Sequence, residues 1–189
     1  MSAKIIAFPV KEEVGLTEHE RDTILVAADE MICVGGRELL VQMLKGMRSE
    51  VVLEAGAEKR KNFGALSALT LGEIEAKIDQ LVQEDLLRIE LYGSRSLLVH
   101  SPSGWIRVKS LWSELLWRAF ERRLRARDFG GLQAEVGRLH VEVKLSVLER
   151  IAREDAARFQ PLLSSWRERE TRRIRRKIDE VLARIAPAR

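Results

Sequence analysis

Several residue types are scarce in this 189-residue sequence, and each scarcity excludes a class of protein. A single cysteine, Cys33, excludes an internal disulfide and a multi-cysteine zinc site. The three histidines, His19, His100 and His140, lack metal-ligand spacing, so we predict no metal and no other cofactor. No apolar run approaches the ~18 residues of a membrane span, and no secretion leader is present. We therefore expect no membrane partner and a cytoplasmic protein, nucleoid-associated if the cell is bacterial.

Recognisable catalytic motifs are equally scarce in the sequence. No GxxxxGKS or GxxxxGKT loop occurs, so the sequence contains no cradle for ATP. The neighbouring acid and base groups are His140 with Glu142 and Glu84 with Asp85. Neither pair is accompanied by a nucleophile, a Gly-rich loop or a metal set, so we predict no enzymatic activity.

Charge is distributed unevenly along the chain, although the net charge is only +4. Residues 1–104 contain 12 Lys or Arg against 17 Asp or Glu, and residues 105–189 contain 21 against 12. A basic half is what a phosphate-binding surface needs. Solvated helices with i,i+4 pairs between Arg and Glu give the same count, so charge alone leaves both interpretations open.

The first part of the chain predicts two helices and a polar turn. Residues 1–16 are expected to form an arm that is either mobile or an edge strand. A capping box at Thr17 and Glu20 begins a helix that we expect to reach about Cys33, closed by two glycines. A second helix is predicted from Gly36 to Lys45. A short helical turn, SEVVLEAG, and a polar loop over residues 57–64 follow.

A third helix and a hairpin complete this pattern. A second capping box, Thr70 with Glu73, precedes apolar residues at helical spacing. Two β-like segments, residues 87–91 and 96–100, then flank the turn Tyr92-Gly93-Ser94-Arg95. Three helices followed by a two-stranded wing are the order of a winged helix-turn-helix.

The remainder predicts a helical extension. We expect a break at residues 101–104, a return strand at 105–108 and a helix from Ser110 that stops at residues 128–131. A helical segment follows over residues 132–157, in which the alternation of HVEV allows a strand. Pro161 is expected in the first turn of a last helix that reaches Ile185. The fold class is thus mainly α (α+β), with an arm (1–16), a winged-helix domain (17–107) and a basic helical extension (108–189).

Residues 29–99 also resemble a known family, the RecQ C-terminal (RQC) winged-helix domain of RecQ-type DNA helicases. The resemblance rests on the order and spacing of VQMLKG, SEVVLEAG, the KNFG turn, LTLGEI and LVQEDLLRIE. The sequence departs from the family after Gly46, where Met-Arg-Ser-Glu replaces a Gly-Ser start followed by two lysines. Because the sequence has no ATP-binding loop and its single cysteine rules out the zinc module that normally precedes the domain, the chain is interpreted as a stand-alone version without the helicase motor.

The resemblance implies binding to duplex or branched DNA through phosphate contacts, with a wing that wedges between base pairs in some relatives. It points to Arg48, Ser49, Lys59, Lys61, Asn62, Phe63 and Thr70, and to Tyr92 and Arg95 in the wing. Arg60 completes the three consecutive cations of the turn, and the last helix adds Arg172, Arg173 and Arg176. An ordinary solvated loop and a tyrosine packed on its own hairpin remain the alternatives for the turn and the wing.

Three functions remain open from the sequence. The first is a DNA-binding protein whose basic tail adds affinity or oligomerisation, through a protein partner or a homodimer. The second is a protein-interaction subunit of a DNA-processing or defence complex. The third is a dimeric transcriptional regulator, for which the expected third helix offers few base-reading groups because it presents Glu73, Glu75, Lys77 and Gln80.

Overall fold

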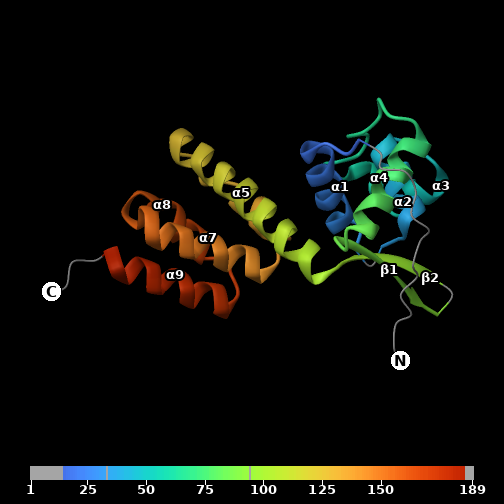
Figure 1. Cartoon of the computed structure of the whole chain (residues 1–189). Helices are drawn as coiled ribbons and strands as arrows, with labels where there is room; N and C mark the ends of the chain where they lie inside the picture. The colour runs from blue at the N-terminus through green and yellow to red at the C-terminus, as the bar shows by residue number, and fades with distance from the viewer. Residues whose placement is uncertain (1–14, 33, 94, 186–189) are drawn as a thin grey trace. The chain divides into compact units, whose positions relative to one another are not determined.

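The computed structural model describes residues 15–32, 34–93 and 95–185. The expected arm lies outside them up to residue 14, as does Cys33. Contacts divide the chain into two compact units between Val108 and Lys109, which we call the winged unit and the C-terminal unit. The elements of the winged unit (Figure 1) are α1 (Glu18–Glu30), α2 (Arg37–Lys45), α3 (Glu50–Glu54), the 3-10 turn η1 (Ala57–Lys59), α4 (Leu71–Gln83), β1 (Leu87–Tyr92) and β2 (Arg95–His100).

Both predicted capping boxes begin helices. Thr17 caps α1 and Thr70 caps α4, and in each box a glutamate three residues later binds back to the cap amide. Helix α1 ends at Glu30, three residues before the expected end. Gly36 does not close α1 as expected but allows a close approach to β2. A Cβ on Gly36 would lie 2.6 Å from the carbonyl oxygen of Ser96.

The sheet is the predicted wing. Strands β1 and β2 pair in antiparallel register from Leu87 opposite His100 to Tyr92 opposite Arg95, which leaves a two-residue turn. Apolar side chains of α1, α2 and α4 and of the base of the hairpin form the buried core. The largest fully buried ones include Ile24, Leu25, Leu40, Met43, Leu44, Ile74, Ile78, Leu81 and Leu87. A winged helix-turn-helix with a helical extension is therefore confirmed.

The expected break and return strand at residues 101–108 are wrong, because this stretch is the start of a long helix, α5 (Pro102–Ala126). The Ser101 hydroxyl accepts from the amide of Gly104, and Pro102 occupies the first helical position, where no amide donor is needed. Gly104 is required by packing, since a Cβ there would lie 1.8 Å from the Leu86 carbonyl oxygen. The boundary between the two units thus falls within α5.

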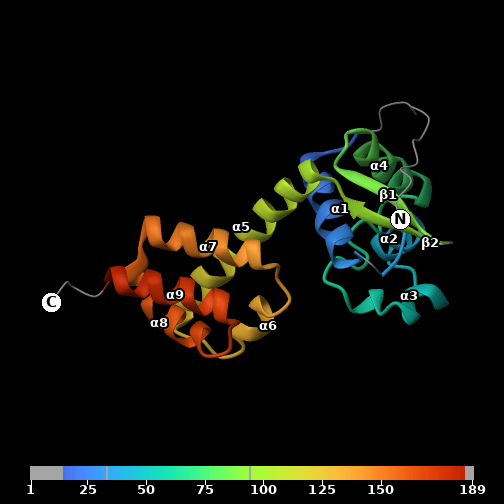
Figure 2. The same ribbon diagram turned by 90° about the horizontal axis from the view of Figure 1, so that it is seen from below.

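The C-terminal unit contains the rest of α5 and four further helices, seen together in Figure 2. These are α6 (Leu132–Val136), α7 (Val141–Glu154), α8 (Ala156–Arg167) and α9 (Arg172–Ile185). The HVEV segment begins a helix, so the strand alternative is wrong. Pro161 lies inside α8 rather than in its first turn, because Asp155 caps that helix earlier in the chain.

The expected single last helix is divided into α8 and α9 by a buried polar cluster. The Glu170 carboxylate accepts from Lys144 Nζ at 2.7 Å and from Trp166 Nε1 at 2.8 Å. Lys144 and Glu170 are each 5% exposed. Because a buried carboxylate requires such partners, Glu170 turns inward and the chain bends before α9 begins at Arg172. Figure 1 shows α7, α8 and α9 packed side by side.

Candidate nucleic-acid interface

Five of the cations that the structure describes in the winged unit are paired with carboxylates of the same unit. Arg37 holds Asp79 through two bonds of 2.6 and 2.9 Å, and Lys77, which is 4% exposed, lies 3.0 Å from a Glu20 oxygen. Arg21 binds Glu84, and this hydrogen bond lowers the pKa of the glutamate. Further pairs join Arg88 to Asp85 and Arg107 to Glu18 and Asp22. Carboxylates of the same unit thus offset the charge of these five cations.

The other described cations of this unit, Lys45 excepted, lie in the loop after α2, in the turn before α4 and at the wing tip, and all are among those predicted to bind DNA. Arg48, Lys61 and Arg95 are exposed, and the described part of the chain offers them no ion pair. The Lys59 side chain is 81% exposed, with its ammonium 3.6 Å from a Glu58 oxygen. Arg60 as a whole is half-buried. Its Nε atom is fully buried and has no hydrogen-bond partner among the described residues. None of the side chains of Arg48, Lys59, Lys61 and Arg95 makes a hydrogen bond with a described residue, and we call these exposed groups the four free cations.

The turn before α4 is held firmly against the end of α2. The Gly64 amide donates to the Met43 carbonyl at 2.8 Å, and a Cβ on Gly46 would lie 3.1 Å from the Gly64 Cα. Both glycines have positive φ, so each loop needs glycine at this contact. Lys45 donates to the carbonyls of Ser67 and Leu69 at 2.7 Å each. The sequence interpretation missed this positioning role of Lys45, for which its place in the last turn of a helix was a signal.

Three other predicted residues of these loops face the fold. The Ser49 hydroxyl caps α3 and binds the Gln42 side chain. Asn62 Nδ2 donates to a Glu30 carboxylate oxygen at 3.2 Å, and Phe63 is half-buried. These contacts set the shape of the loops that present the free cations.

The start of α4 already holds a carboxylate. The Thr70 hydroxyl donates to Glu73 at 2.7 Å and accepts from the Glu73 amide at 3.2 Å. The Thr70 amide and hydroxyl lower the pKa of Glu73, so the helix start carries a negative charge. The one cation of α4, Lys77, is buried. A phosphate at this helix start therefore meets a neighbouring carboxylate, unlike at an open helix N-terminus.

The tip of the wing presents an aromatic side chain beside a cation. Tyr92 is 60% exposed, and its cross-strand neighbour Arg95 is exposed as well. More than half of the Tyr92 surface is therefore open to solvent. A ring and a guanidinium at a hairpin tip can stack on a base and bind a phosphate at the same time.

The wing and the basic turn lie at opposite ends of α2. The carbonyl of Gly35, before α2, accepts from the Leu98 amide of β2, and Gly64 contacts the far end of α2 at Met43. Figure 1 shows the wing and the connection before α4 on opposite sides of the winged unit. The wing and the basic turn are thus attached to opposite ends of a nine-residue helix, so the unit presents its free cations in two separate groups.

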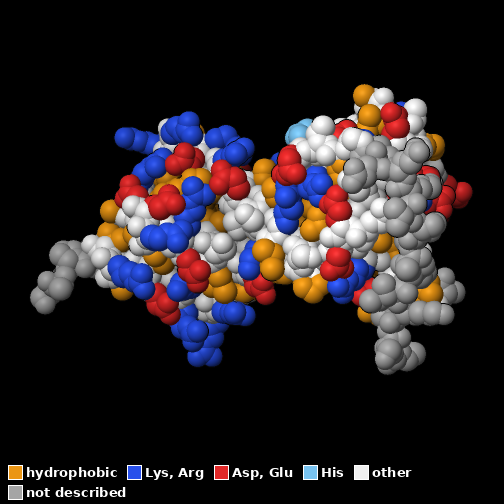
Figure 3. All heavy atoms as spheres, viewed as in Figure 1, with side chains coloured by type: hydrophobic (Ala, Val, Ile, Leu, Met, Phe, Trp, Pro, Cys, Tyr) orange, Lys and Arg blue, Asp and Glu red, His pale blue; other side chains and the backbone are white. Residues whose placement is uncertain are grey.

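The predicted residues of the tail lie on α9 in the C-terminal unit. Arg172, Arg173 and Arg176 are exposed, while Ile174 and Ile178 of the same helix are buried. Figure 3 shows Lys and Arg side chains over the visible face of this unit, interleaved with Asp and Glu. The arginines of α9 are thus on an accessible helix face.

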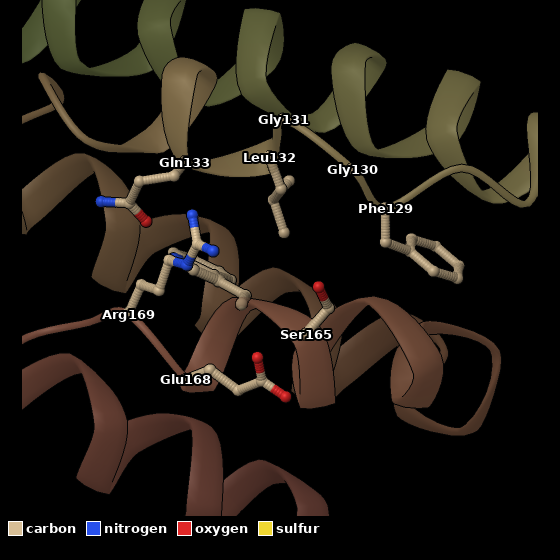
Figure 4. Close-up of a pocket in the computed structure, with 9 residues that line it drawn as sticks. Phe129, Gly130, Gly131, Leu132, Gln133, Ser165, Glu168 and Arg169 are labelled. Atoms are coloured by element: carbon tan, nitrogen blue, oxygen red, sulfur yellow. The ribbon is translucent and has the colours of Figure 1, made fainter.

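A hollow of about 300 Å³ in the C-terminal unit is the alternative place for chemistry. Figure 4 shows Gln133 and Arg169 at one end and Phe129 at the other. Glu168 is the one carboxylate in its lining, which contains neither cysteine nor histidine. Ser165 also lines the hollow, and the described residues show no hydrogen bond that joins its hydroxyl to the Glu168 carboxylate as a base.

The described residues contain neither a metal-binding cluster nor a membrane-spanning helix. No group of three or more His, Cys, Asp or Glu among them is arranged to hold a metal ion. None of the helices in the described ranges is long and apolar enough to cross a membrane.

Comparison with known proteins gives one result. The family model described as RQC domain matches residues 18–127, which covers the winged unit from α1 and continues past the end of α5. No curated protein and no solved structure matches the chain.

Proposed function

This chain belongs to the RQC domain family, whose domains are non-catalytic DNA-binding winged helices, and from that premise we propose that it holds duplex or branched DNA mainly through phosphate contacts. The observation that carries the proposal is the wing tip, where the exposed ring of Tyr92 lies opposite the exposed Arg95. Arg48, Lys59 and Lys61 provide backbone contacts at the other end of α2. The protein acts in the cytoplasm, on the nucleoid if the cell is bacterial.

The electrostatics of the winged unit favour recognition of DNA shape over base sequence. Helix α4 has no exposed cation among its residues, and Glu73 occupies its start. Major-groove readout relies on Arg, Lys, Asn or Gln side chains on the inserted helix, and of these α4 exposes only Gln83, its last residue. The proposal therefore assigns affinity to the free cations and preference for a duplex end or fork to the wing.

The wing is tested by comparing DNA forms with and without the ring of Tyr92. Fluorescence anisotropy would measure binding of the full chain to blunt duplex, forked duplex and single-stranded DNA. Stacking on a base is worth ~1–3 kcal/mol, so Tyr92→Ala should weaken forked-duplex binding by about 5- to 150-fold. Tyr92→Phe keeps the ring and is the matched control. Equal affinities of the wild type and Tyr92→Ala for all three DNA forms would remove the wing from the proposal.

A second candidate function is a protein-interaction subunit, and one observation favours it. Val51 and Leu53 on α3 are 55% and 47% exposed, and Glu50 and Glu54 flank them. An exposed apolar pair beside carboxylates suits a basic, apolar partner surface. If this function holds, Val51→Ser with Leu53→Ser abolishes partner capture and leaves DNA affinity unchanged.

A further inference from the structure

The first five residues of α9 contain four exposed arginines on a helix that is fixed to its unit. We call Arg172, Arg173, Arg175 and Arg176 the arginine surface. The opposite side of α9 is buried through Ile174, Ile178 and Val181, which are at most 1% exposed. The arginine surface is therefore presented by a packed helix and is not a frayed tail.

The carboxylates near this surface are largely engaged elsewhere. Arg167 on α8 binds both oxygens of Asp179. Glu180 lies 3.6 Å from Lys177 Nζ and 3.8 Å from Arg176 Nε, and both distances exceed those of a hydrogen-bonded pair. Arg172 and Arg173 have no ion pair with any residue that the structure describes. The arginine surface thus keeps most of its positive charge.

The position of these arginines within α9 adds to that charge. The first turn of α9 contains no acidic residue, and the partial positive charge of a helix dipole lies at the same end. Cations at a helix start repel this partial charge and one another. An anion bound at this helix start relieves both repulsions, so the arrangement favours the anion-bound state over the unbound state.

The arginine side chains also enclose a place for such a ligand. A surface hollow of about 570 Å³ is lined by the four arginines and Asp179. Guanidinium groups bind phosphate oxygens through two parallel hydrogen bonds, and residues three or four apart on a helix lie ~5–6 Å from each other. Several guanidinium forks thus face one hollow, which suits successive phosphates of one strand.

We propose that the arginine surface is a second DNA-backbone site, which binds phosphates of the same DNA that the winged unit engages. This inference rests on the proposed function, because the winged unit supplies the reason to expect nucleic acid rather than an acidic protein. Arg175 contributes less than the others, since its Nη2 also donates to the Glu170 carbonyl at 3.1 Å. The C-terminal unit then increases affinity without reading sequence.

The test uses the full chain and the salt dependence of binding to a duplex of about 20 base pairs. In Arg172→Gln/Arg173→Gln/Arg176→Gln the arginine surface is neutralised. The matched control, Arg122→Gln/Arg138→Gln/Arg153→Gln, removes three exposed arginines of the same unit that have no ion pair among the described residues. Circular dichroism checks that both variants fold. Each lost phosphate contact lowers the slope of log affinity against log salt by ~0.9.

The expected result is a slope smaller by about 2.7 for the first variant and little change for the control. Between 50 and 200 mM salt, the wild type then loses about 40-fold more affinity than the variant. Equal slopes for the two variants would overturn the inference, as would a polyglutamate peptide that competes as well as DNA of equal charge. A parallel variant with Lys59→Gln/Lys61→Gln separates the two proposals, because it tests the winged unit alone. Absence of DNA binding by the wild type would overturn both.

Discussion

Replacing Lys144 by methionine should destabilise the C-terminal unit strongly. Lys144 Nζ lies 2.7 Å from a Glu170 oxygen, and the two side chains are 7% and 1% exposed. Removing the ammonium leaves a buried carboxylate whose remaining donors are the Trp166 indole at 2.8 Å and the Thr171 amide at 3.2 Å. Breaking one side of a buried ion pair costs about 3–5 kcal/mol. For a unit of this size, that corresponds to a fall in Tm of more than about 10 °C.

A double variant distinguishes the buried charge from lost packing. In Lys144→Met/Glu170→Gln no charge is buried, and the amide oxygen still accepts from the Trp166 indole, so we expect it to regain at least about 2 kcal/mol. Arg118→Met, which breaks an exposed i,i+4 pair with Glu114, should change the free energy of unfolding by less than about 0.5 kcal/mol.

Urea unfolding followed by tryptophan fluorescence is the assay, because three of the four tryptophans, Trp112, Trp117 and Trp166, lie in the C-terminal unit. A loss of less than about 1 kcal/mol in Lys144→Met, with no gain in the double variant, would refute the assignment of a buried ion pair at the α8–α9 turn.

Three further predictions concern the winged unit. Gly104→Ala places a Cβ 1.8 Å from the Leu86 carbonyl oxygen and should lower the free energy of unfolding by at least ~1–3 kcal/mol. Gly72→Ala is the control, because its Cβ would meet nothing within 4 Å and should cause no such loss. Urea titration of the two variants measures the difference. Thr70→Ala removes the hydroxyl of the α4 capping box and should cost about 1 kcal/mol by the same assay, and no loss would contradict the cap. The hydrogen bond from Arg21 lowers the pKa of Glu84, so the folded state favours the ionised carboxylate. The resulting contribution to the free energy of unfolding is present above the ordinary glutamate pKa of ~4.3 and is lost as pH falls through the lower folded-state pKa. Unfolding at pH 6 and pH 3 should show a smaller acid loss in Glu84→Gln than in the wild type, and equal losses would disprove the coupling.

Local signals in the sequence were sufficient for most of the winged unit. The capping boxes at Thr17 and Thr70 and the two-residue wing turn each involve residues within a few positions of each other, so their patterns are visible in one stretch. Ser101 and Pro102 also form a local helix start, but were interpreted as a break because serine and proline are common in turns as well. The division of the chain into an arm, a winged domain and an extension stays a prediction in its stated bounds.

Long-range contacts explain what the sequence did not provide. The bend between α8 and α9 depends on Glu170 meeting Lys144, 26 residues away, and periodicity alone continues the helix through it. Long-range contacts also decide which cations of the candidate site are available. Lys77 appears free in the sequence, yet it is buried against Glu20, 57 residues away. Sequence reasoning selected the free cations by analogy with a family, while the internal ion pairs explain why Arg21, Arg37 and Arg107 are not among them.

The central claim is that the free cations of the winged unit bind DNA phosphates, and the salt dependence of DNA binding tests it most directly. Anisotropy titrations of the full chain with a labelled forked duplex would compare the wild type with Lys59→Gln/Lys61→Gln and with the equal charge loss Arg122→Gln/Arg153→Gln. We predict measurable binding at about 50 mM salt and a slope smaller by ~1.8 for the lysine variant only. No binding at about 50 mM salt, or identical slopes for all three proteins, would contradict the account.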